Sequence, residues 1–289
     1  MQFIIHIIIF ALIFSILSCW FRFFIKIKWN CDYSYIAIVM FSSYISAILN
    51  TKFWISMLGT FWISLLCTIP FALLVFLLSK RLNNFYFSIG TLSFYILIYQ
   101  LAYNAEFLTN WAYGVSNIKR FLIWDFNILW NEWYLILMLI ISAILFCWLY
   151  LFKKTSIYKN FIWRWENELS LKSLWISSNK SKLLIICLSA LLATIAWSCY
   201  TFYYCYISPS SFWFSTLILI LTIVFISYKY NEFGVVLVSL IILALYEGLR
   251  FIKFVDPGRI WYFREIIFSL IVIVIAFITF KKINFWREQ

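Results

Sequence analysis

Few side chains in this chain have the type and spacing to do chemistry, and several of them share one apolar stretch. Between residues 85 and 108, Thr91, Ser93 and Gln100 supply hydroxyl and amide groups, and Glu106 supplies a carboxylate at its end. On a helix Ser93 and Gln100 share a face, whereas Thr91 and Ser93 lie about 200° apart. Polar groups are costly inside a membrane, so they indicate a path for a polar solute. The alternative is that the hydroxyls only bond to carbonyls of their own helix.

The sequence contains none of the catalytic motifs that we would expect of a membrane enzyme. The chain has no HExxH, no GxSxG and no paired intramembrane aspartates, and its one histidine, His6, has no carboxylate close to it in sequence. Without a Walker A loop, any ATP chemistry belongs to another subunit. The 7 cysteines form no CxxC pair, so neither a disulfide framework nor a metal site is expected. We expect no cofactor and no catalytic activity.

The composition requires these residues to be carried by membrane helices. With 65% apolar and 12% charged residues and a mean hydropathy of +0.96, the chain is unlike a soluble domain. A helix needs roughly 17 to 25 apolar residues to cross a bilayer core. Suitable stretches run over residues 3–21, 33–49, 54–79, 85–108, 132–152, 183–206, 212–228, 233–252 and 264–280. Because Phe3–Leu17 shows no alternation, a β-barrel is excluded. The prediction is an all-α polytopic protein with about nine spans in a single transmembrane domain over residues 1–289.

Basic residues predict the orientation of the spans. With the N-terminus outside, 16 of the 23 Lys and Arg residues fall in alternate loops and in the tail, which places those loops and the C-terminus in the cytoplasm. The net charge of +12 then indicates topology and a preference for anionic lipid, and its division among loops argues against nucleic-acid binding. No clear cleavage site follows the first stretch, so we expect a retained helix.

The most polar interval, residues 153–182, contains 7 basic residues and 2 glutamates. Glu166 and Glu168 suit a helix start, and the residues after them form a short apolar surface. Such a helix lies either on the membrane face, anchored by tryptophans, or in the cleft of a partner protein.

Several segments in order resemble the LivM-type permeases of branched-chain amino acid ABC importers. They are RLNNFYFSIGTLSF at 81–94, FLTNWAYGVSNI at 107–118, ENELSLKSLWI at 166–176, YISPSSF at 206–212 and YEGLRF at 246–251. The third is similar to the family's cytoplasmic coupling segment, which favours docking to a partner over lying on the membrane. Together the matches cover roughly residues 30–289.

The resemblance implies a permease subunit in a bacterial inner membrane, with residues 153–182 as its cytoplasmic coupling loop. The implied partners are ABC ATPase subunits, a second related permease, a substrate-binding protein and membrane lipid. Substrates of the family include branched-chain and other amino acids, amides and urea. The expected ATPase-coupling residues are Glu166, Asn167, Glu168, Leu169, Ser173, Leu174 and Ile176. The expected translocation-path residues are Thr91, Ser93, Gln100, Thr109 and Gly114.

The chain departs from the family in its glycines, of which it has only 6. The family's GHAAFFGIGAY-like segment appears as SYIAIVMFSSY at 34–44, and its GGLGSLWGP-like turn appears as SYKYNEFGV at 227–235. Because glycine permits close helix approach, the alternative function is a degenerate or repurposed homologue that acts as a membrane scaffold without transport. A proton-coupled carrier would need carboxylates or histidines well inside the spans, which the chain lacks.

Overall fold

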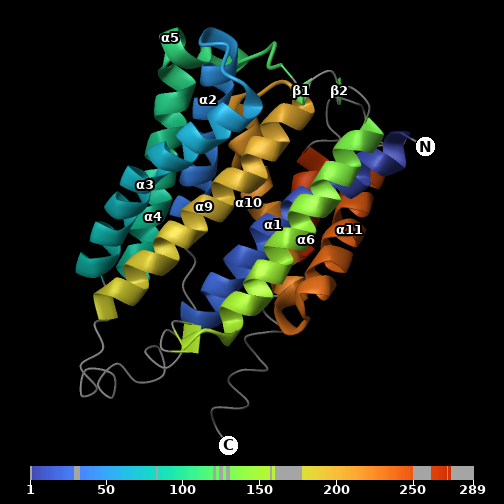
Figure 1. Cartoon of the computed structure of the whole chain (residues 1–289). Coiled ribbons are helices and arrows are strands. Elements are labelled where there is room, and N and C mark those ends of the chain that lie inside the picture. The colour runs from blue at the N-terminus through green and yellow to red at the C-terminus, as the bar shows by residue number, and fades with distance from the viewer. Residues whose placement is uncertain are drawn as a thin grey trace, which may run out of the picture.

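The protein is a bundle of long helices in the computed structural model (Figure 1). The structure describes residues 2–28, 33–82, 84–119, 122–123, 126–127, 131–156, 158–159, 178–249, 262–271 and 273–274. The long helices are α1 (Gln2–Lys28), α2 (Ser34–Lys52), α3 (Met57–Arg81), α4 (Asn84–Asn104), α6 (Asn131–Lys154), α9 (Ser178–Tyr204), α10 (Phe214–Ile226) and α11 (Glu232–Gly248). Short elements join them: α5 (Glu106–Thr109), the 3-10 helices η1 (Trp111–Tyr113), η2 (Pro209–Phe212) and η3 (Ser227–Lys229), and strands β1 (Leu122–Ile123) and β2 (Phe126–Asn127). Residues 262–271 are also helical.

Six described helices are long and apolar enough to cross a membrane, which confirms a polytopic, all-helical protein. They lie in α1, α2, α3, α6, α9 and across η2 and α10. The predicted spans at 85–108 and 233–252 correspond to helices α4 and α11, which were not among the six. The count of about nine spans therefore stays a prediction.

The bundle has two groups of helices joined by α9. Helix α2 packs against α3 and α4, whereas α1 packs against α6, α10 and α11, and α9 contacts α1, α2 and α3 (Figure 1). In the apolar windows of α1, α2 and α9, 72% of the residues are buried, against 28% in α3 and 22% in α6. The core of the molecule thus lies along α1, α2 and α9, and α3 and α6 are peripheral.

Serines occupy tight positions on α2 where the related segment of the family has glycine. Of the three glycines in that segment, two correspond to Ser34 and Ser42, both fully buried, and the third to the buried Met40. The Ser42 and Ser43 hydroxyls donate to the Val39 carbonyl at 2.9 and 2.7 Å. A serine is nearly as small as glycine, and when its hydroxyl bonds to a carbonyl of its own helix no polar group is left unpaired in an apolar surrounding. Close packing of α2 therefore survives most of the glycine loss.

The loops expected on alternate sides of the membrane gather at opposite ends of the bundle. At one end the Lys52 ammonium donates to the Phe107 carbonyl at 2.7 Å, and the Lys119 amide donates to Asn50 Oδ1 at 2.8 Å. Arg22 lies at the other end, with the C-terminal end of α6 and the start of α11. The two ends correspond to the two predicted sides, and which end faces the cytoplasm stays a prediction.

Candidate functional site

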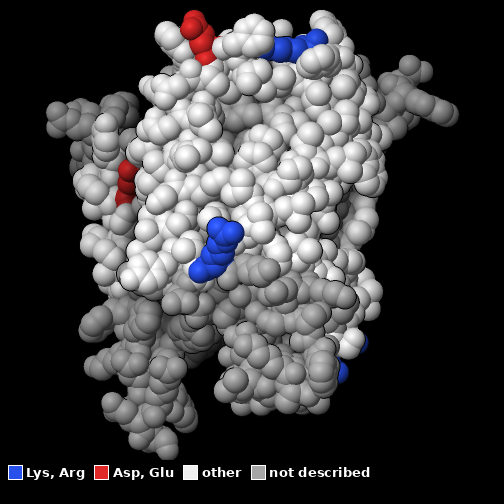
Figure 2. Space-filling model, turned by 90° about the vertical axis from the view of Figure 1, so that its left-hand side faces the viewer, with Lys and Arg blue, Asp and Glu red and all other residues white. Residues whose placement is uncertain are grey.

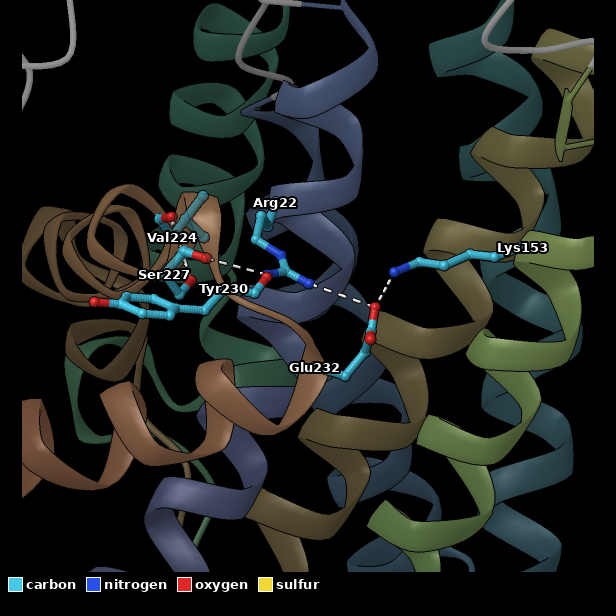
Figure 3. A network of polar contacts seen from close by, with 6 residues as sticks. All are labelled: Arg22, Lys153, Val224, Ser227, Tyr230 and Glu232. Atoms are coloured by element: carbon cyan, nitrogen blue, oxygen red, sulfur yellow. Dashed lines mark hydrogen bonds and ion pairs between the residues drawn. The ribbon is translucent and has the colours of Figure 1, made fainter.

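Arg22, near the C-terminal end of α1, is the centre of a polar network at one end of the bundle (Figure 3). Its side chain is almost fully buried, with 4% exposed. Nη1 donates to the Ser227 carbonyl at 3.1 Å and also to the Tyr230 carbonyl, and Nη2 lies 3.5 Å from Glu232 Oε1. The same carboxylate oxygen accepts from the ammonium group of Lys153. One carboxylate therefore connects α1, α6 and α11.

Local backbone chemistry explains why these residue types meet here. The chain turns from α10 through η3 into α11, so the carbonyls of Ser227 and Tyr230 lie beyond a helix C-terminus, where a cation is favourable. Glu232 is in the first turn of α11, where the helix dipole favours a negative charge. Arg22 satisfies both groups at once, because its guanidinium presents several donors in a planar fork.

The start of the predicted coupling loop lies beside this network. Lys153 and Lys154 end α6, and Tyr158 follows with its ring 6.1 Å from that of Phe152. Burial raises the pKa of Tyr158 above its ordinary value, and the positive charge of Arg22 lowers it in part. The first residues after α6 are thus held against the charged end of the bundle.

The predicted ATPase-coupling residues, Glu166 to Ile176, lie outside the described residues. The structure therefore gives the anchor of the loop at α6 and the start of α9 at Ser178, between which the segment runs.

Two of the translocation-path candidates are threonines whose hydroxyl groups form hydrogen bonds with backbone groups. Thr91 is fully buried; its hydroxyl accepts from the Tyr33 amide at 3.3 Å and donates to the Ser88 carbonyl at 3.0 Å. Thr109 is buried at α5 and donates to the carbonyls of Ala102 and Ala105 at 2.6 and 2.8 Å. Both hydroxyls satisfy backbone, which agrees with the alternative weighed for Thr91.

Gly114 is required by a close backbone approach. Its φ is +72°, and a Cβ atom there would lie 2.0 Å from the Ile207 carbonyl oxygen. The next residue, Val115, exchanges backbone hydrogen bonds with Ile207 at 2.8 and 3.0 Å. This bridge closes the loop after α5 onto the segment that follows α9.

Ser93 and Gln100 differ from the other candidates because they are exposed on α4. They share a face as predicted, and that face points away from the rest of this chain. The structure thus divides the five candidates into three buried residues and two outward-facing polar groups. Figure 2, seen from the side where α3 and α4 lie, shows a broad surface with few charged side chains.

The prediction of no metal site can be compared with the part of the chain that the structure describes. Within it, no group of three or more His, Cys, Asp or Glu residues could hold a metal ion, and the six described cysteines are free thiols.

The Arg22, Glu232 and Lys153 network was not anticipated from the sequence, where the basic residues served only as topology signals. The usable signal was Glu232, an acidic residue at the start of an apolar stretch on the predicted basic side. Sequence alone could not pair it, because its partner Arg22 is far away along the chain.

Residues 3–276 match the family model described as the permease component of the branched-chain amino acid transport system. Comparison with curated proteins and with solved structures gave no match.

Proposed function

Because the chain belongs to the branched-chain amino acid transport system permease family, we propose that it forms half of the translocation path of an ATP-driven importer. Its substrate would be a branched-chain or related amino acid, and its location a bacterial inner membrane. ATP hydrolysis would occur on separate ATPase subunits, and a second permease and a substrate-binding protein would complete the assembly. The observation that carries this proposal is the family match over nearly the whole chain, together with six described helices that are long and apolar enough to cross a membrane.

The placement of Ser93 and Gln100 supports a path shared between two subunits. Both side chains face away from this chain's own core. A polar side chain that faces lipid is unfavourable, and interhelical contacts with another subunit relieve that cost. The second permease would therefore cover this face of α4, and the two polar groups would line the path between the subunits.

Coupling to the ATPases would run through residues 166–176, which lie between α6 and α9 along the chain. Movement of that segment would reach the core directly, because α9 packs against α1, α2 and α3. The bundle would then alternate between outward and inward access as the ATPases close.

Close packing weakens the observation that motivated the scaffold alternative, which was the loss of glycines. Gly114 is kept where backbone contact demands glycine, and Ser34 and Ser42 preserve small volume on α2.

The test is to purify the chain from its native membranes in mild detergent and identify the proteins that accompany it. The wild type is compared with Leu169→Arg in the coupling segment, and with Phe107→Arg as a matched control. Phe107 is 86% exposed at the opposite end of the bundle, so its substitution should leave ATPase binding intact. An ABC ATPase and a second permease should accompany the wild type and the control, and Leu169→Arg should lose the ATPase.

Recovery of neither partner, under conditions that preserve other ABC complexes, would refute the importer and favour the scaffold. Uptake then separates the two functions again: Glu168→Ala should abolish it in an importer while the chain stays inserted.

A further inference from the structure

A half-open groove of about 390 Å³ lies between α6 and α11. Both helices pack against α1, and the groove runs beside the charged network. Its lining residues are Ala143, Phe146, Cys147, Tyr150, Glu232 and Phe233. The volume is within the range of about 300 to 1,000 Å³ that is usual for sites of small ligands.

The lining selects an apolar occupant. Glu232 is the single charged side chain among the lining residues, and its Oε1 is already held by Lys153 and Arg22. Water in such a groove would find few hydrogen-bond partners, and empty space would forfeit the dispersion contacts of the aromatic rings. Within a bilayer, the apolar molecule at hand is the acyl chain of a lipid.

The mouth of the groove selects the headgroup. The ammonium group of Lys154 lies 4.4 Å from the centroid of the Tyr150 ring, which lines the groove. Lys153 bonds to Glu232, which lines it from the other side. Arg22 and Lys153 both pair with the Glu232 carboxylate, and Lys154 adds a third positive charge beside them, so the cluster keeps two positive charges in excess. Basic residues at the membrane surface attract anionic lipids.

We propose that this groove is a binding site for one anionic phospholipid, with an acyl chain between α6 and α11 and the phosphate at Lys153 and Lys154. The site differs from general contact with lipid because one defined groove and one charge cluster act on the same molecule. Lipid bound there would brace α6, which is only 22% buried in its apolar window and whose C-terminal end leads into the predicted coupling loop.

Two variants test the two parts of the site. Ala143→Trp fills the groove with a side chain, and Lys154→Gln removes an exposed charge at the mouth. Their matched controls are Ile140→Trp, at an exposed position of α6 that does not line the groove, and Lys119→Gln at the opposite end of the bundle.

The full-length chain, with whatever subunits accompany it, is titrated with phosphatidylglycerol or phosphatidylethanolamine of identical acyl chains, and bound lipid is counted by native mass spectrometry. The wild type and both controls should retain about one phosphatidylglycerol per chain in preference to phosphatidylethanolamine. Both test variants should lower that retention at least several-fold.

Equal retention of the two lipids by the wild type, or wild-type retention by either test variant, would overturn the proposal. If Ala143→Trp fails to insert, Lys154→Gln still decides, because its side chain is exposed and the substitution leaves the buried contacts of α6 in place. The readout involves no transport, so it is independent of the importer proposal.

Discussion

Arg22 is a buried charged side chain with several polar partners. Among the described residues no other charged residue is buried, and Arg22 donates to two carbonyls and pairs with a carboxylate. Burying a charge is costly unless it is paired and hydrogen-bonded, and here both conditions are met. Lys153, a third exposed, adds a second cation to the same carboxylate from the side of α6.

The two cations should therefore differ in their effect on stability. Arg22→Met leaves two carbonyls without their donor and removes one of the two cations beside Glu232, which we expect to cost about 3 to 5 kcal/mol. Lys153→Met removes a partly exposed pair, worth about 1 kcal/mol or less. Thermal unfolding in detergent should show a large fall in Tm for Arg22→Met and a small one for Lys153→Met; the reverse order would contradict the burial argument.

Gly114 offers a second residue-scale prediction. Gly114→Ala forces a positive φ on a residue with a Cβ and drives that atom into the Ile207 carbonyl. The backbone strain alone should cost on the order of 1 to 3 kcal/mol. The control is Gly248→Ala, where a Cβ would meet nothing within 4 Å. In the same Tm measurement, similar values for the two variants would show that the Val115 to Ile207 bridge does not need glycine.

At the scale of elements, the difference between central and peripheral helices matters most. In the apolar windows of α2 and α9, 72% of the residues are buried, against 22% in α6. Small residues on the central helices allow their backbones to approach closely, as is usual for packing in membranes.

Enlarging a small residue should consequently depend on the helix that carries it. Ala47 is fully buried on α2, so Ala47→Leu must displace packed neighbours, with an expected cost of about 1 to 3 kcal/mol. Ala143→Leu makes the same change at an exposed position of α6 and, in detergent without added lipid, should leave Tm unchanged. Detergent-solubilised yield and Tm measure both; an equal loss for the two alanines would contradict the assignment of the core.

At the scale of the whole molecule, the helices divide the loops between two ends. Phe107 and Lys52 meet at one end, and Lys153, Glu232 and Arg22 meet at the other. The basic bias of the second set predicts that it faces the cytoplasm.

Labelling from outside the cell checks this orientation. Cysteine introduced at Phe107 should react with a membrane-impermeant maleimide in intact cells, because that side chain is 86% exposed at the predicted outer end. Cysteine at the exposed Ser156, just beyond α6, should react only after the membrane is opened. The parent chain gives the background from native cysteines. Labelling of Ser156→Cys in intact cells would reverse the orientation.

The sequence by itself determined that this is an all-helical membrane protein of a permease family, because apolar stretch length and ordered motifs are local properties of the chain. It also placed Ser93 and Gln100 on one face, since helix geometry alone decides that. Only the tertiary structure decided that Thr91 and Gly114 contact backbone groups from distant parts of the chain. It alone also showed that Arg22, Glu232 and Lys153 form one network. Those contacts join residues far apart along the chain, and their partners are set by how the helices pack. The groove beside α6 also depends on the tertiary structure. It is lined by residues of both α6 and α11, so the sequence of either helix alone does not predict it.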